Sequence, residues 1–174
     1  MTIKVLINKP CLKWPNSNVG KLIDKDIVEK TLQQLVDLDV RNIIFSGGNP
    51  LLYWSKVVEA IKFIEESNIK TNISINTNGF GFTEEIQRYS IDHKISYCFT
   101  LFADTPERYQ LVTGSDKLYF ELCNAIELCK KCNIPYSVCL LLVPELRKHF
   151  NEIHKFANNL GGLELSNLVQ SLNS

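Results

Sequence analysis

Short runs of apolar residues recur along this chain, and each is followed by a longer stretch with helical spacing of its apolar positions. The short runs predict strands at residues 3–8, 42–46, 71–77, 95–102 and 136–143. The segment LELSNL, residues 163–168, is expected to begin a sixth strand.

Helices are predicted between these strands. They are expected at residues 24–38, at 53–67, from about Thr83, at 116–132 and at 145–159. Gly161 and Gly162 are expected to end the last helix. Residues 101–120 are expected to be a strand end, a loop and a helix entry.

Regular alternation of strands and helices predicts an α/β fold with a parallel sheet and right-handed crossovers. Two architectures fit, an open doubly wound sheet or a (β/α) barrel, whole or partial. Five or six units are too few to close an eight-stranded barrel. We expect one domain over residues 1–174, the N-terminal part of a longer protein.

The strands carry one apolar face and one face of small polar residues, because side chains alternate along a strand. The polar positions include Asn8, Asn72, Ser74, Asn76, Ser96, Cys98 and Thr100. This pattern favours a curved sheet with helices on the convex face and a hydrophilic concave face that binds a ligand or peptide. An α+β sheet with one solvated face is the alternative.

Composition excludes some partners. Of the 174 residues 45% are hydrophobic and 22% are charged, and the formal net charge is zero. These values are typical of a globular domain and do not favour nucleic acid or a membrane as a partner. Six cysteines in a chain this large indicate reduced thiols in the cytoplasm rather than a disulfide framework.

Two turns follow predicted strands and carry candidate chemistry. In SGGNP, residues 46–50, two glycines allow close approach of a ligand, and the next residues lead into a helix. In NTNG, residues 76–79, Asn and Gly favour a tight turn. Each alone is typical of a structural turn, and the first could also bind phosphate at a helix N-terminus.

In this order, the two turns and the later segment LFADTPERYQLVTGS resemble the radical S-adenosylmethionine (radical SAM) family. The resemblance implies a partial (β/α)6 TIM-like barrel. It also implies S-adenosylmethionine (AdoMet) and a [4Fe-4S] cluster held by a C-x3-C-x2-C loop after the first strand. Residual cofactor contacts would fall on Gly47, Gly48, Asn49, Pro50, Asn76 and Asn78.

Three features depart from the family. Cys11 matches the first cluster cysteine, but Pro15 and Asn18 stand where the second and third would be, and iron here needs thiolates. Asn49 replaces the glutamate of the family's G-G-E-P turn, which receives the cofactor's ammonium. Val112 stands about where the family has an arginine. We therefore expect no metal site and no cofactor in this chain.

With these departures, the chain resembles the pseudo-radical SAM proteins of Bacteroidales peptide-maturation systems. That resemblance implies a non-catalytic component that binds a short peptide, an intact radical SAM enzyme, or both. One alternative is an active radical SAM enzyme whose cluster has unrecognised ligands. Another is a barrel enzyme of different chemistry that binds phosphate at the GGNP turn, with Asp104 as its acid.

The remaining cysteines and one tryptophan have more than one interpretation. Cys129 and Cys132 form a C-x2-C pair, but they lie in a helical pattern, which favours core packing over a metal or redox site. Cys98 and Cys139 are expected on strands, as lumen fillers or ligand contacts. Trp14 either plugs the former cofactor site or packs the loop onto the sheet.

Overall fold

The computed structural model describes residues 2–6, 30–31, 34 and 40–161. Within them, five strands form one sheet: β1 (Thr2–Leu6), β2 (Asn42–Ser46), β3 (Asn72–Thr77), β4 (Ser96–Leu101) and β5 (Tyr136–Leu140). The expected sixth strand, residues 163–168, lies outside the described residues.

Five α-helices and two 3-10 helices connect the described strands. They are η1 (Pro50–Tyr53), α2 (Trp54–Glu66), α3 (Glu84–Asp92), α4 (Pro106–Thr113), α5 (Lys117–Lys131), η2 (Pro144–His149) and α6 (Phe150–Leu160). The helix expected at 24–38 falls mostly outside the described residues, although Lys30, Thr31 and Gln34 are helical. No helix of the described part is long and apolar enough to cross a membrane.

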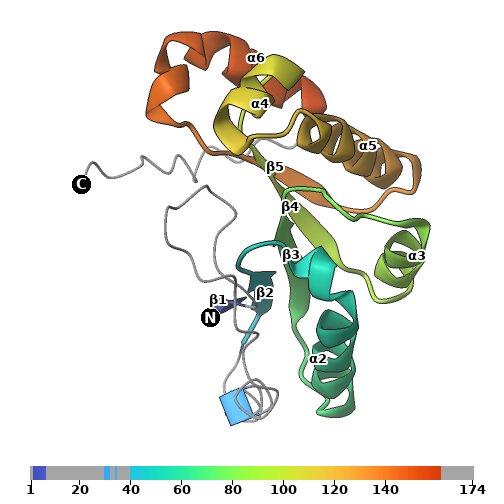
Figure 1. Cartoon of the computed structure of the whole chain (residues 1–174). Helices are drawn as coiled ribbons and strands as arrows, with labels where there is room; N and C mark the ends of the chain where they lie inside the picture. The colour runs from blue at the N-terminus through green and yellow to red at the C-terminus, as the bar shows by residue number, and fades with distance from the viewer. Residues whose placement is uncertain (1, 7–29, 32–33, 35–39, 162–174) are drawn as a thin grey trace.

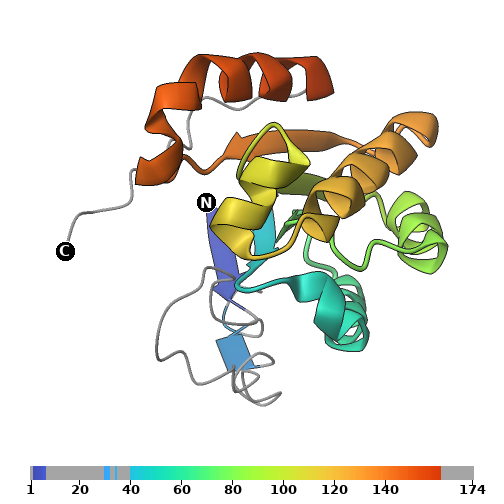
Figure 2. The ribbon, with the colours of Figure 1, turned by 45° about the horizontal axis from the view of Figure 1, so that its top comes forward.

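Strand order separates the two architectures that the sequence left open. The sheet runs β1-β2-β3-β4-β5, and each neighbouring pair is parallel. A doubly wound sheet reverses its order at a switch point, whereas an unbroken order places every right-handed crossover on the same face. The labelled helices lie on one side of the sheet (Figures 1 and 2), as in a partial barrel with helices on its convex face.

The core fills the space between the sheet and these helices. From the strands come Ile43, Phe45, Ile75, Tyr97, Phe99 and Val138, all at most 1% exposed. From the helices come Val57 and Ile61 of α2, Leu122 and Ala125 of α5, and Ile153 of α6. Burial of this apolar layer is the main stabilising term of the fold.

One predicted segment was wrong. Residues 101–120 contain a complete helix, α4 (Pro106–Thr113), rather than a loop between a strand and a helix entry. The Thr105 side chain caps its start, Pro106 occupies the first turn, and Gly114 ends it with a left-handed φ of 79°. Helix α4 buries only Tyr109 fully, so its apolar spacing was too weak to predict a helix.

Three other predicted boundaries also shift. The helices expected at 53 and 145 are each preceded or begun by a 3-10 helix, with Pro50 and Pro144 at the start. Strand β5 ends at Leu140, three residues before its predicted end. Proline lacks a backbone N–H and fixes φ, which suits the first turn of a helix.

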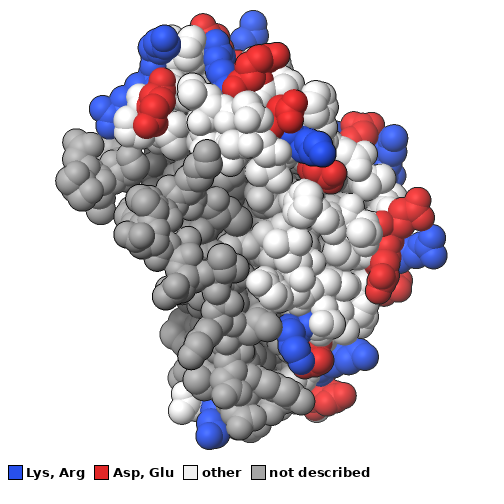
Figure 3. Space-filling model, viewed as in Figure 1, with Lys and Arg blue, Asp and Glu red and all other residues white. Residues whose placement is uncertain are grey.

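Charged side chains of both signs are interspersed over the outer surface of the helices. Figure 3 shows them around the edge of this view, with a broad white area between them where the described residues are uncharged. Among the residues described on this face, no block of one sign gathers, and such a block is the usual footprint of a nucleic-acid surface.

Candidate functional site

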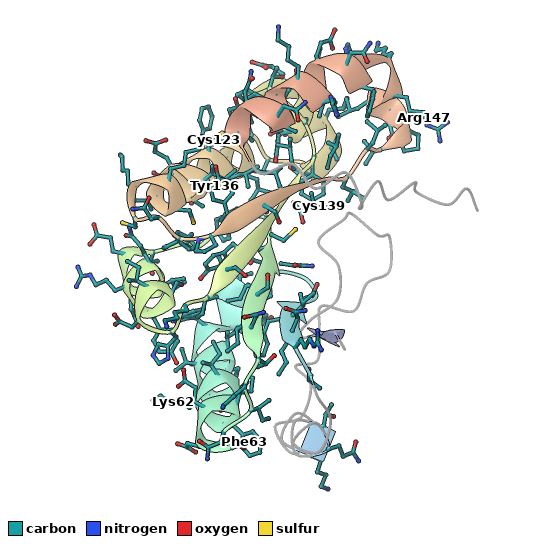
Figure 4. The ribbon with its side chains drawn as sticks, turned by 180° about the vertical axis from the view of Figure 1, so that it is seen from behind. Lys62, Phe63, Cys123, Tyr136, Cys139 and Arg147 are labelled. Atoms are coloured by element: carbon teal, nitrogen blue, oxygen red, sulfur yellow. The ribbon has the colours of Figure 1, made fainter. Side chains whose placement is uncertain are left out.

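The open face of the sheet carries small polar side chains, as predicted. On β3, Ile73 and Ile75 are buried on the helix side while Ser74 and Asn76 are half-buried on the other. The same alternation occurs on β4, where Ser96, Cys98 and Thr100 share the open side. Figure 4 shows Cys139 of β5 on the side of the sheet away from the helices.

Register brings these side chains into rows across neighbouring strands. Ser74 pairs with Ser96, Asn76 with Cys98, and Thr100 with Cys139. At the start of the strands, Asn72 Nδ2 donates to Asn42 Oδ1 at 3.1 Å. Strands β2 to β5 contain no Lys, Arg, Asp or Glu, so their part of this face offers amide, hydroxyl and thiol groups. On β1, Lys4 pairs with Ile44, in the same row as Ser74.

The turn after β2 is joined to the turn after β3 through one side chain, that of Asn49. Its Oδ1 accepts hydrogen bonds from Thr77 Oγ1 at 2.8 Å and from the Leu51 N–H at 3.3 Å. Its Nδ2 donates to the Phe80 carbonyl at 2.7 Å. An amide oxygen has two lone pairs, so Asn49, which is 3% exposed, uses both within the protein.

The turn after β3 continues this network. The Gly79 N–H donates to Thr77 Oγ1, and the Phe80 N–H donates to Asn78 Oδ1. Gly79 has a φ of 84°, and a Cβ there would lie 2.8 Å from the Leu122 Cα of α5. A glycine is therefore required where this turn meets the helix layer.

The structure brings together the residues on which the resemblance placed residual cofactor contacts. Gly47, Gly48, Asn49 and Pro50 follow β2, Asn76 lies in β3, and Asn78 follows it. All six thus occupy the carboxyl edge of two neighbouring strands. Both glycines have positive φ, 97° and 49°. Asn8, Cys11, Trp14, Pro15 and Asn18 lie outside the described residues.

The turns after β4 and β5 hold a charged cluster that sequence reasoning missed. Arg108 of α4 donates to both oxygens of Asp104, at 2.7 and 2.8 Å. Its Nη2 lies 2.9 Å from His149 Nδ1 and 3.3 Å from Glu152 Oε2. Hydrogen bonding to Asp104 raises the pKa of Arg108. Asp104, the candidate acid, is therefore committed to an ion pair.

A sequence signal existed for half of this cluster. Asp104 and Arg108 are four residues apart at the start of a helix, a spacing that favours an ion pair. Nothing local links Arg108 to His149, which is 41 residues away. Val112, where the family has an arginine, is a partly buried side chain packed against the core.

Cysteines of the C-x2-C pair lie in the helix layer. Cys129 is fully buried, and burial raises the pKa of its thiol to about 12. Cys132 contacts the Gln87 side chain of α3. The prediction that Cys129 packs in the core is confirmed. Among the described residues, no three His, Cys, Asp or Glu side chains gather as metal ligands would.

Solved structures with this fold include radical SAM enzymes. The structure of native anSMEcpe with bound AdoMet has a TM-score of 0.76 and 18% identity, and the similarity covers 99% of this chain and 53% of that one. Streptococcus suis SuiB bound to its precursor peptide SuiA has a TM-score of 0.69 and 17% identity, over 92% of this chain and 37% of that one.

Sequence comparison leads to the same family. A probable GTP 3',8-cyclase of Methanococcus maripaludis strain C7 is 30% identical over 106 residues, which is 59% of this chain and 34% of that protein. The chain thus spans about a third of the length of this curated relative. The model of the radical SAM superfamily matches residues 9–157, well over half of the chain. The chain belongs to the radical SAM superfamily.

Proposed function

We propose that this chain is a binding component of a peptide-maturation system and does not catalyse radical chemistry. The polar open face of its sheet would receive a short peptide or the peptide-bearing surface of an intact radical SAM enzyme. The hydrogen bonding of Asn49 is the observation that carries this proposal.

Asn49 does not fit the amino end of AdoMet. The family glutamate at this position offers a charged acceptor to the cofactor's ammonium, whereas an amide has no charge. Both lone pairs of Asn49 Oδ1 are already used by Thr77 and Leu51. Turning this oxygen toward a cofactor would leave those two donors without their acceptor, which is costly in a buried site.

The sequence of the first loop supports the same conclusion. A [4Fe-4S] cluster is held by cysteine thiolates. The segment from Asn8 to Asn18 contains one cysteine, Cys11. The two other positions of the family motif are Pro15 and Asn18, which cannot supply a thiolate.

The open face of the sheet supports peptide binding. Its side chains, including Ser74, Asn76 and Thr100, are of the types that donate and accept hydrogen bonds, as a peptide backbone requires. Because β2 to β5 carry no charged residue, their part of the face favours a neutral segment. One structural neighbour, SuiB, is bound to a precursor peptide.

Anaerobic reconstitution with iron and sulfide tests the loss of chemistry. Iron and sulfide are quantified and the visible spectrum is recorded with and without AdoMet, for the wild type and for Cys11→Ala. We expect no stoichiometric cluster in either protein. About four irons per chain, with a spectrum that responds to AdoMet and is lost in Cys11→Ala, would show that the chain is an active radical SAM enzyme.

A displayed peptide library tests the binding role. Peptides selected on the wild type are measured against Asn76→Asp, which places a carboxylate on the open face. The matched control is Asn158→Asp on the exposed side of α6. We expect binding about tenfold weaker in Asn76→Asp and unchanged in the control. Equal affinities in both variants would place the peptide elsewhere.

A further inference from the structure

The seam between α4 and the η2–α6 segment contains a histidine with two competing partners. His149 Nδ1 lies 2.9 Å from Arg108 Nη2 and 2.8 Å from Glu152 Oε2. Arg108 and Glu152 are themselves 3.3 Å apart. The three groups form a triangle at the end of η2.

One nitrogen cannot serve both partners at the same time. An arginine only donates hydrogen bonds and a carboxylate only accepts them. His149 Nδ1 must therefore be unprotonated to accept from Arg108 and protonated to donate to Glu152. When the ring is protonated at both nitrogens, the resulting imidazolium also brings two cations into contact, which is unfavourable.

We propose that His149 is a pH-dependent latch between α4 and the η2–α6 segment. With neutral His149, Arg108 donates to Nδ1 and ties α4 to η2. With protonated His149, Nδ1 donates to Glu152, and the bond lies within the η2–α6 segment. Histidine is the side chain whose ordinary charge change falls between pH 5 and 8, so the exchange is tested over that range.

The charged groups around the latch favour this exchange. Asp104 holds the other side of the Arg108 guanidinium through two hydrogen bonds, so Arg108 keeps a partner when it leaves His149. On α5, burial and the neighbouring Cys123 raise the pKa of Tyr119, and the negative charge of Asp104 is a smaller cause.

The other ionisable neighbours along the chain do not enter the triangle. Arg147 points outward from η2 (Figure 4), and Glu145 and Lys148 are exposed on the same turn. His154 of α6 contacts the Asn158 side chain instead. The latch therefore depends on Arg108 and Glu152.

The proton position on His149 is directly measurable. Protein labelled with ¹⁵N-histidine gives long-range correlations that report which ring nitrogen carries hydrogen, and His93→Gln and His154→Gln variants assign the signals. We expect Nδ1 of His149 to be unprotonated at pH 8 and protonated at pH 5. Hydrogen already on Nδ1 at pH 8 would overturn the proposal.

Two substitutions must move the titration in opposite directions. Arg108→Gln removes the cation beside the ring, so protonation of His149 is expected at higher pH. Glu152→Gln removes the carboxylate, so protonation is expected at lower pH. The control is Arg88→Ala, which breaks an exposed ion pair with Glu84 on α3. It should not change the pH at which His149 is protonated. Shifts in the same direction, or none, would overturn the latch.

Hydrogen exchange tests the mechanical consequence. After correction for the intrinsic pH dependence, amides of η2 and the first turn of α6 are expected to exchange about two- to fivefold faster at pH 5 than at pH 8. Glu152 is 57% exposed at its side chain, so Glu152→Gln should fold normally and provides the comparison if Arg108→Gln does not. Equal corrected rates at both pH values would exclude a latch. This test does not depend on peptide or cofactor binding.

Discussion

The two halves of the sheet's carboxyl edge are held together by different chemistry. After β2 and β3, the turns are joined by neutral hydrogen bonds of Asn49 and Thr77, both at most 3% exposed. After β4 and β5, the turns are joined by charged side chains, and Arg108 is 23% exposed at its side chain. The same edge of one sheet thus contains a buried neutral network and a partly buried charged one.

This difference determines how each half responds to its surroundings. A buried neutral hydrogen bond is insensitive to pH and salt, and it is costly to break because its partner is left unsatisfied. A partly exposed ion pair contributes less and is screened by salt. We therefore expect the β2–β3 half to be fixed and the β4–β5 half to be adjustable.

Gly79→Ala is expected to have the largest effect on the fixed half. A Cβ would lie 2.8 Å from the Leu122 Cα, and φ is already 84°. We expect the free energy of unfolding to fall by about 3 kcal/mol or more, as the sum of left-handed strain and overpacking. Urea denaturation measures this loss.

Gly81→Ala is the matched control. Gly81 has a similar φ of 81°, but the nearest atom to its Cβ would be the Leu52 Cδ2 at 3.9 Å. Only the left-handed strain applies, and the expected loss is about 1 kcal/mol. Equal losses for the two alanines would mean that contact with α5 does not constrain the turn.

Asn49→Ala is expected to have the next largest effect. It removes the acceptor of Thr77 and Leu51 and the donor to Phe80, and we expect a loss of about 2–3 kcal/mol. Asn72→Ala, on an exposed position of the same sheet, should change stability by less than about 0.5 kcal/mol. Similar losses at both positions would show that Asn49 does not join the turns.

The layers and the polar face were predictable from the sequence because both depend on local periodicity. Alternation along the predicted strands at 71–77 and 95–102 correctly placed Ser74, Asn76 and Cys98 on one face. The same reasoning missed α4, although Thr105 and Gly114 carried start and stop signals, because only eight residues of weak apolar spacing lie between them.

The contacts that distinguish the two halves could not be predicted in the same way. Asn49 meets Thr77 across 28 residues, and Arg108 meets His149 across 41. Such pairs depend on which strands are neighbours and on how far each turn extends. The sequence marked Asn49 as a replaced cofactor residue and carried no sign that its side chain joins two turns.

The helix caps next to each half sharpen the comparison. Thr83 caps α3 by accepting from the Ile86 N–H, and Thr105 caps α4 by accepting from the Arg108 N–H, both at 3.3 Å. We expect Thr83→Ala and Thr105→Ala each to cost about 1 kcal/mol at pH 8. Urea denaturation at pH 8 and at pH 5 measures the free energy of unfolding of each variant.

The pH dependence of these two losses should differ. Loss of the Thr105 cap loosens the start of α4 and displaces Arg108 from His149. The loss of unfolding free energy in Thr105→Ala is therefore expected to be smaller at pH 5, where the hydrogen bond between Arg108 and His149 is already absent. The Thr83→Ala loss should be the same at both pH values, because its cap bond to the Ile86 N–H is neutral. A pH-dependent loss at Thr83 would contradict the division into a fixed and an adjustable half.

Salt is expected to have the smallest effect and to act on one half only. At about 1 M NaCl the Debye length falls to about 3 Å, which weakens the partly exposed contacts of Arg108. Exchange of the Leu146 amide in η2 should then accelerate by about twofold or less, while the Gly79 and Phe80 amides, bonded to neutral side chains, keep their rates. In Glu152→Gln the effect of salt on η2 should shrink. If salt accelerated amide exchange equally in both halves, the charged cluster would not be what holds η2 against α4.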